Sequence, residues 1–171
     1  MRLILAIFKV EISVYWIKYK QVKRANMKFE ITTEILINAP IDIVWKTLTN
    51  FEDYKNWNPF IINVSGETHQ GGKINVTIQN DATSKMSFKA LVLENQENKQ
   101  FSWRGKLLVK GIFDGEHKFR LEQISNNQTK LIHSEAFSGI LVKPFLKNLQ
   151  TKTKPGFERM NHALKVKLES Q

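Results

Sequence analysis

Cysteine is absent from the 171 residues of this chain, and its absence removes one class of chemistry. Without thiols the chain forms no disulfide bonds and uses no thiolate as a nucleophile or metal ligand. A chain without cysteine fits a reducing compartment, so we expect a cytoplasmic location. Long apolar runs are also missing: residues 3–8 are too short to span a bilayer. Lys9 and Glu11 interrupt the pattern beyond them, and a secretory signal fits poorly because no small-residue cleavage site follows.

Motifs for metal, phosphate or nucleophilic chemistry are missing as well. No metal-ligand spacing links the four histidines, which are His69, His117, His133 and His162. Gly71-Gly72 is a turn rather than a phosphate loop, because no Lys-Ser pair or helix start follows it. No second element arms Ser134 as a nucleophile. We therefore expect no metal and no cofactor.

The chain is basic, with a net charge of +10 from 26 Lys and Arg against 16 Asp and Glu. Half of this excess lies in residues 1–26, which hold six Lys and Arg against Glu11 alone. No nucleic-acid recognition motif accompanies the charge, and scattered lysines are typical of a solvated surface. We expect no nucleic-acid partner.

Residues 1–26 do not match the patterning of the rest of the chain. Trp16, Ile17 and Tyr19 stand next to several lysines, which suits a membrane interface. We favour the alternative that this segment is an upstream extension, because Met27 directly precedes the first well-patterned strand. The chain then divides into an N-terminal extension, residues 1–26, outside the core, and one domain, residues 27–171.

A single apolar stripe runs along residues 143–170 at helical spacing. Its members are Phe145, Leu146, Leu149, Phe157, Met160, Leu164 and Leu168. Pro155-Gly156 interrupts it, and proline suits only the first turn of a helix. The pattern predicts a short helix, a break or kink near Lys154, and a longer helix to about Leu168.

The residues before this helix mostly show the period-two alternation of half-buried strands. Predicted strands cover residues 28–38, 61–68, 73–79, 85–94, 99–104, 111–124 and 129–138, and short helical segments cover 41–48 and 51–56. Short polar connectors make antiparallel hairpins. This order predicts an α+β fold in which a curved seven-stranded antiparallel sheet surrounds the long C-terminal helix.

Six motifs in this order resemble the START-like superfamily. They are INAPIDIVW (residues 37–45), YKNWNP (54–59), FSWRG (101–105), GEHKF (115–119), HSEAFSG (133–139) and GFERMNHALK (156–165). Over residues 28–169 the chain is similar to the polyketide cyclase/dehydrase and lipid-transport branch, also called SRPBCC. The resemblance implies a helix-grip (Bet v 1-like) fold with a deep apolar cavity between sheet and helix. It implies no single function, since members bind lipids, sterols, quinones or polyketides and some catalyse cyclisation or dehydration.

Strand parity sorts the side chains that face such a cavity. The predicted ligand-binding set is mostly apolar, which suits an apolar ligand. It comprises Trp57, Ile74, Val76, Phe88, Phe101, Trp103, His117, Phe119, His133, Glu135, Phe137, Phe157, Met160 and Leu164. Core packing is the alternative for the tryptophans, Phe157 and Met160, and both interpretations hold where the core is also the cavity wall.

The strand over residues 129–138 leaves two alternatives. If the turn over residues 125–128 contains an odd number of residues, His133 and Glu135 face inward together with His117. An even number places Ile132 and Ala136 there instead, because a one-residue shift exchanges the faces. We favour a three-residue loop, since it also puts Leu131 and Phe137 inside.

His117 and Glu135 are then the candidate catalytic residues. Burial moves the pKa values of a carboxylate and an imidazole toward the values that acid/base chemistry needs. We favour the alternative that they hydrogen-bond each other, or the polar head of a ligand, without chemistry.

Two connectors are apolar where polar residues are expected. Residues 105–111 contain Leu107 and Leu108, and residues 139–144 contain Ile140 and Leu141. Apolar loops near a cavity mark an entrance or a contact surface, and flanking Gly or Pro lets them move as lids. The four residues are candidates for transient membrane contact. The alternative is that they pack and only close the core.

These observations favour a non-catalytic or weakly catalytic domain that binds, and in one version transports, a small apolar ligand such as a lipid, quinone or polyketide-like compound. We expect a monomer or weak dimer. One alternative is a cyclase or dehydratase that uses His117 and Glu135, and two or more titratable groups converging in the cavity favour it. The other is an interaction module like START-like chaperone activators, for which the cavity is filled by side chains.

Overall fold

The computed structural model describes residues 28–80, 84–107 and 111–170. The expected extension, residues 1–26, lies outside the described residues, and so does Leu108. In the part of the chain that the structure describes, no helix is both long enough and apolar enough to cross a bilayer.

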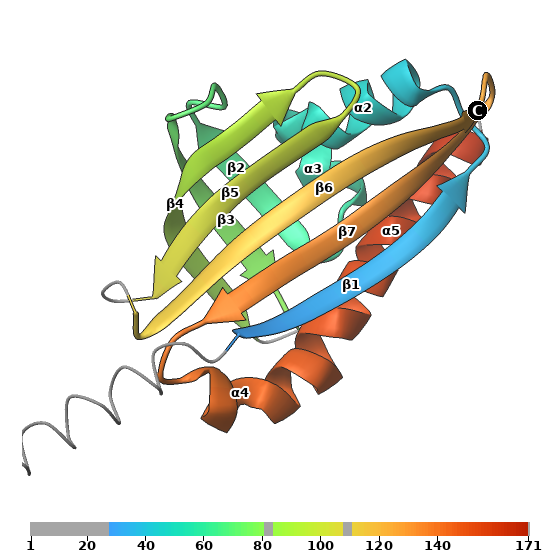
Figure 1. Cartoon of the computed structure of the whole chain (residues 1–171). Coiled ribbons are helices and arrows are strands. Elements are labelled where there is room, and N and C mark those ends of the chain that lie inside the picture. Colours follow the sequence, from blue (N-terminus) through green and yellow to red (C-terminus); the bar gives the residue numbers. More distant parts are fainter. Residues whose placement is uncertain (1–27, 81–83, 108–110, 171) are drawn as a thin grey trace, which may run out of the picture.

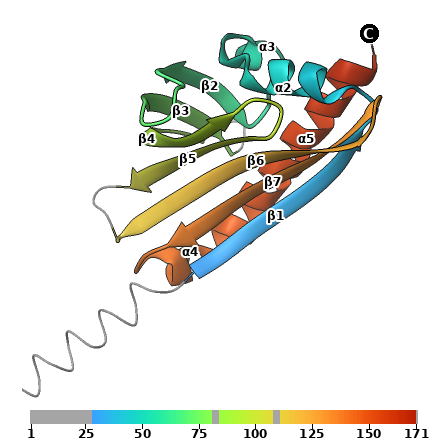
Figure 2. The same cartoon turned by 45° about the horizontal axis from the view of Figure 1, so that its top comes forward.

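One antiparallel sheet carries the fold, with strand order β1-β7-β6-β5-β4-β3-β2. The strands are β1 (Lys28–Ile37), β2 (Ile61–Gly66), β3 (Lys73–Gln79), β4 (Lys85–Gln96), β5 (Gln100–Leu107), β6 (Phe113–Ser125) and β7 (Gln128–Ser138). Figures 1 and 2 show a curved sheet with the C-terminal helix lying along its concave face. The predicted α+β helix-grip fold is confirmed.

Alternation along the strands sets which face is covered. In β1, Ile31, Thr33 and Ile37 are buried, while the residues between them are mostly exposed. Because successive strand side chains point to opposite faces, one face of β1 packs against the helix and the other meets water. The same period over β3 buries Ile74 and Val76.

The C-terminal helical region has three parts. α4 (Val142–Asn148) leads into a π-helical segment, η2 (Leu149–Thr153), and then into α5 (Lys154–Glu169). Pro155 lies in the first turn of α5, where its missing N–H needs no partner. The predicted break near Lys154 is thus a π-helical segment that ends at residue 153. The buried residues of α5 include Phe157, Met160 and Leu164, as the apolar stripe predicted.

Both apolar connectors are shorter than predicted. β5 continues to Leu107, because Gly105, Lys106 and Leu107 keep their ladder partners on β6. The second connector ends at residue 141, since α4 begins at Val142, whose side chain is fully buried. Residues 105–107 belong to β5 because their backbone pairs with β6, and Val142 belongs to α4, where its side chain is buried.

The β6–β7 hairpin decides the inner face of β7. The turn contains two residues, Asn126 and Asn127, rather than the predicted three, since Ser125 pairs with Gln128. A bulge between Gln123 and Ser125 adds one residue and restores the odd register. His117 is therefore paired with Glu135, and Phe119 with His133. These residues share the inner face, as the odd-register alternative predicted.

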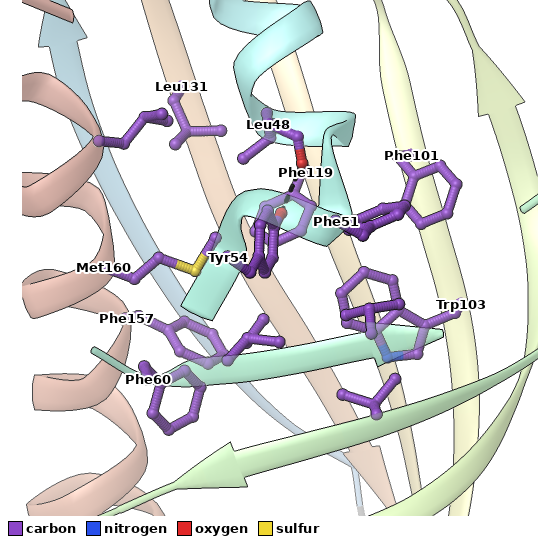
Figure 3. Close-up of a cluster of buried hydrophobic side chains, with 14 of the residues drawn as sticks. Leu48, Phe51, Tyr54, Phe60, Phe101, Trp103, Phe119, Leu131, Phe157 and Met160 are labelled. Atoms are coloured by element: carbon purple, nitrogen blue, oxygen red, sulfur yellow. Dashed lines mark hydrogen bonds between the residues drawn. The ribbon is translucent and has the colours of Figure 1, made fainter. Parts of the chain in front are cut away.

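The groove between sheet and helix is filled at one end. Between β1 and β2, the chain forms α2 (Ile41–Thr49), η1 (Phe51–Asp53) and α3 (Tyr54–Trp57). Figure 3 shows Phe51 and Tyr54 from this connection packed toward Phe101 and Phe119 of the sheet. The ring centroids of Phe51 lie 5.2 Å from those of both Tyr54 and Phe101. Phe51 and Tyr54 thus form an aromatic plug at that end of the groove.

Candidate functional site

The other end of the groove is hollow. A cavity of about 260 Å³ lies between the α4–η2 region and the inner faces of β2 to β7. Most of its wall is apolar. Its lining residues are Phe60, Ile61, Val76, Ile78, Asn80, Ser84, Met86, Phe88, Trp103, Gly105, Phe113, Gly115, His117, Glu135, Phe137, Phe145, Asn148, Leu149, Lys152 and Thr153.

A pair of glycines lies in the wall of the cavity and makes room for two of its lining side chains. Gly105 on β5 and Gly115 on β6 are direct cross-strand partners, and both have the inward parity of Trp103 and His117. A Cβ atom at Gly105 would lie 2.8 Å from the ring of Phe88, and one at Gly115 would overlap the carboxyl of Glu135. Since no side chain rises from these two positions, Glu135 occupies the space above Gly115.

The mouth of the cavity is marked by the lining residues that are also exposed to solvent. They are Met86, Phe145, Asn148 and Lys152, and three of them belong to α4 or η2. The opening therefore lies beside this helical region. Ile140 and Leu141, which the sequence proposed for an entrance, do not line the cavity. The side chains of residues 106–110 lie outside the description, so an entrance role for Leu107 and Leu108 stays a prediction.

The predicted ligand-binding residues fall into two groups. Six line the cavity: Val76, Phe88, Trp103, His117, Glu135 and Phe137. The other eight belong to the packed interior or its edge: Trp57, Ile74, Phe101, Phe119, His133, Phe157, Met160 and Leu164. In the second group, Phe101 and Trp57 contact the aromatic plug through Phe51 and Tyr54.

Several lining residues were missed although the sequence carried a signal for them. Strand parity already placed Ile78 and Met86 inside, and Phe113 and Gly115 share the parity of His117. Phe145 and Leu149 belong to the apolar stripe of the C-terminal helix. The polar residues at the mouth, such as Asn148 and Thr153, carried no comparable signal.

A chain of polar side chains crosses the interior and ends at the cavity. Thr33 Oγ1 on β1 donates to the backbone oxygen of His133, 3.2 Å away. Asn161 Nδ2 on α5 lies 2.9 Å from Thr33 Oγ1, and Asn161 Oδ1 lies 2.9 Å from His133 Nδ1. His133 Nε2 lies 2.9 Å from His117 Nε2. His117 Nδ1 lies 3.4 Å from Glu135 Oε2.

Aromatic rings enclose the two imidazoles of this chain. Trp103 stacks on His117 with centroids 4.2 Å apart, and Phe157 stacks on His133 at 3.8 Å. Both histidines are buried, with His117 only 3% exposed and His133 not at all. The rings fix the imidazole planes and keep water from their faces.

Burial sets the charge of the three titratable groups. Desolvation lowers the pKa of His117 from 6.5 to about 3. Desolvation and the nearby His117 hold the pKa of His133 well below its usual range, against the hydrogen bond to Asn161. Desolvation raises the pKa of Glu135 from 4.5 to about 8. At neutral pH all three groups are therefore uncharged, because a low-dielectric site penalises the charged form of each.

Metal binding has no support in residues 28–80, 84–107 and 111–170. They contain no group of three or more His, Cys, Asp or Glu side chains that could hold an ion. The cavity-facing carboxyl of Glu135 is able to form hydrogen bonds and to exchange a proton.

Comparison with known proteins gives a family and a fold. The family model described as polyketide cyclase/dehydrase and lipid transport matches residues 28–169. No curated protein matches the chain in sequence.

Three solved structures illustrate the likeness in fold. The Zhui aromatase/cyclase of a Streptomyces species shares 15% identity at a TM-score of 0.68, covering 84% of this chain and 94% of its own. A START superfamily protein from Mycobacterium smegmatis shares 16% at 0.61, covering 82% and 97%. Norcoclaurine synthase from Thalictrum flavum, a point mutant solved with a transition state analogue, shares 10% at 0.63, covering 84% and 96%. At these identities the likeness concerns the fold alone.

Proposed function

Because the chain belongs to the polyketide cyclase/dehydrase and lipid transport family, we propose that its cavity binds a small apolar molecule carrying one polar group. The observation that carries this proposal is the pairing of a mostly apolar wall with one uncharged carboxyl, that of Glu135. Ligand pockets typically combine apolar walls with a few polar groups that fix orientation.

The size of the cavity limits the ligand. Its volume of about 260 Å³ lies just below the roughly 300–1,000 Å³ of pockets that bury a drug-sized molecule. A one- or two-ring compound or a short acyl chain fits this space. A larger lipid would have to extend through the mouth beside Phe145 and Lys152.

Binding is favoured over catalysis by the number of polar groups that reach the ligand. Three titratable residues line the cavity: His117 and Glu135 in its buried part, and Lys152, which is exposed at the mouth. By count alone this favours an enzyme. However, both ring nitrogens of His117 already have partners, His133 and Glu135. Of this buried pair, only Glu135 then has an atom left for a ligand, and acid/base catalysis at two positions needs a second titratable group beside it.

A cyclase or dehydratase remains the second candidate, and one observation favours it. The pKa of Glu135 is raised to about 8, and a general acid or base works best with a pKa near the operating pH. In this version Glu135 exchanges a proton with the ligand, and His117 holds the carboxyl in place. The chaperone-interaction alternative predicted a cavity filled by side chains, and the open volume of about 260 Å³ argues against it.

The test begins with native mass spectrometry of the purified protein, followed by titration with 2-methoxynaphthalene as a two-ring apolar probe. We expect saturable one-to-one binding. Ile78→Trp places a large ring inside the cavity and should abolish it. Leu91→Trp is the matched control, since Leu91 is exposed on the neighbouring strand β4. Binding that is absent, or equally strong in both variants, contradicts the proposal.

The enzyme candidate is tested on any compound recovered from the protein. The compound is incubated again with the native protein and with Glu135→Leu, and its mass is followed. A binder returns it unchanged. Loss of water that depends on Glu135 would instead establish a dehydration or cyclisation.

A further inference from the structure

We propose that the cavity selects ligands whose polar group donates a hydrogen bond, such as an alcohol or phenol, over ligands of the same shape that only accept one. The inference rests on the proposed binding function and names the ligand class. It follows from which atom is the donor in each hydrogen bond of the buried chain from Thr33 to Glu135. The direction of these hydrogen bonds leaves an acceptor oxygen of Glu135 facing the cavity.

The direction of the hydrogen bonds is set at Thr33, which does not line the cavity. A backbone carbonyl only accepts hydrogen bonds, so the Thr33 hydroxyl must give its single proton to the oxygen of His133. Thr33 Oγ1 can then only accept from Asn161, which fixes the amide nitrogen of Asn161 on that side. The amide oxygen of Asn161 consequently faces His133 Nδ1, and His133 Nδ1 must carry the proton.

Each following step leaves one choice. A neutral imidazole has one N–H and one acceptor nitrogen, so His133 Nε2 accepts. His117 Nε2 therefore carries the proton between the two rings, and His117 Nδ1 is left as an acceptor. The only partner of His117 Nδ1 among the described residues is Glu135 Oε2, which must be the donor. The carboxyl of Glu135 thus donates its only proton to His117, in the protein interior.

The second carboxyl oxygen, Glu135 Oε1, then has no proton to offer. It lies above Gly115, which lines the cavity together with Glu135. If the proton moves from Oε2 to His117 Nδ1, Oε1 becomes part of a carboxylate and still only accepts. Either position of the proton presents an acceptor to the ligand. A ketone or ether oxygen would face a second acceptor, while a hydroxyl would complete the hydrogen bond.

The surroundings of Glu135 do not change this result. Trp103 and Phe137 line the same cavity with apolar rings, and His117 is the titratable cross-strand partner of Glu135 on β6. The lysine among the lining residues, Lys152, is exposed and comes from η2. Asn80 and Ser84 also line the cavity, and Asn80 Oδ1 is buried without a hydrogen-bond partner among the described residues. It can accept a hydrogen bond from a second donor group of the ligand, which leaves the acceptor role of Glu135 Oε1 unchanged.

The experiment compares three probes of one shape: 2-naphthol, 2-methoxynaphthalene and 2-acetylnaphthalene, titrated near neutral pH. We expect the native protein to bind 2-naphthol roughly tenfold more tightly than the other two, the scale of one buried hydrogen bond. Glu135→Gln should keep this preference, because its amide donates to His117 and still presents an oxygen. Glu135→Leu should lose it.

The distinctive variant is Thr33→Val, which removes the hydroxyl without changing the shape of the side chain. Asn161 is then free to turn its amide, and the direction of the hydrogen bonds can reverse along the whole chain until Glu135 Oε1 carries the proton. We expect the preference for 2-naphthol to fall below about threefold. Thr33→Ser restores the hydroxyl and should restore the preference. Thr32→Val, on the exposed face of β1, should change nothing.

The outcomes separate the two proposals. If neither the native protein nor Glu135→Gln binds any probe, the binding function itself fails. If all probes bind with equal strength, or if acceptor-only probes bind better, only the donor selectivity fails. If folded Thr33→Val keeps the native preference for 2-naphthol, the inference is also overturned, because Thr33 would then not set the direction of the hydrogen bonds. Should Thr33→Val not fold, the comparison of Glu135→Gln with Glu135→Leu decides.

Discussion

The native protein should lose stability as the pH rises above about 6.5. Replacing Glu135 with glutamine should remove this loss. The reason is that the folded state holds a proton on Glu135 which the unfolded chain releases. In the unfolded chain this carboxyl titrates at 4.5, while burial raises its pKa in the folded protein to about 8. A group with a raised folded pKa contributes stability that is complete below the unfolded value and is lost as pH rises through the folded one.

The magnitude follows from the pH window. Between 6.5 and 8 the folded state binds one proton more than the unfolded state at this site. Each pH unit then costs about 1.4 kcal/mol, so the interval of roughly 1.5 units costs about 2 kcal/mol. The figure is an upper limit, because the Glu135 side chain is 17% exposed toward the cavity.

The two buried histidines produce the opposite slope below pH 6.5. The pKa of His117 is lowered to about 3 and that of His133 is also lowered. Below pH 6.5 these two histidines are therefore protonated in the unfolded chain but stay neutral in the folded protein. Stability contributed by these groups is lost as pH falls. Two histidines outweigh Glu135 between 6.5 and 4.5, and we expect maximum stability near pH 6.5.

The assay is urea unfolding of the native protein and of Glu135→Gln at several pH values between 5 and 9. The alkaline arm should be present in the native protein and absent in the variant, while both keep the acid arm. Glu122→Gln is the matched control, because Glu122 lies on β6 outside the cavity, in a half-exposed ion pair with Lys130. It should leave the alkaline arm intact. An alkaline arm of equal size in native protein and Glu135→Gln would refute the assignment of a protonated Glu135.

Three further predictions concern other parts of the molecule. Gly156→Ala should reduce the free energy of unfolding by about 1–3 kcal/mol, measured in urea, because a Cβ there overlaps the buried ring of Phe60. Phe145→Ser should speed the release of 2-methoxynaphthalene in stopped-flow experiments with little loss of stability, since Phe145 lines the cavity yet is 38% exposed. Ile140→Ser should not change the release rate, because Ile140 is 45% exposed but does not line the cavity. A chain that begins at Met27 should melt within about 5 °C of the full chain, the scale of a 1 kcal/mol change.

Much of the fold was predictable because it depends on local periodicity. The period of two marked the strands, and the apolar stripe with Pro155-Gly156 marked the segmented C-terminal helix. Even the inner face of β7 was predictable in outcome, although the mechanism differed. A two-residue turn with a bulge before Ser125 gives the same odd register as a three-residue loop, and local sequence does not distinguish them.

The extent of the cavity was not predictable, because it depends on packing between distant segments. Phe51 and Tyr54 fill one end of the groove, and nothing in their own sequence shows where the sheet will curve around them. The polar chain did leave a trace. Asn161 stands on the apolar face of α5, next to Met160 and four residues after Phe157, and Thr33 stands at an inward position of β1. Polar residues at core positions were the available signal for a buried hydrogen-bond network.

The π-helical segment η2 has a consequence for how this site can change over evolution. Its wider turn holds one residue more than an α-helical turn would, and such segments are sites where a single residue has been accommodated within a helix. Deleting one residue of η2 would let the helix run on as a regular one and would turn α4 by about 100° about its axis. Phe145 and Asn148 would leave the rim, and other residues of α4 would take their places. A one-codon deletion could thus rebuild the entrance while the sheet, the aromatic plug and the buried acid stay as they are.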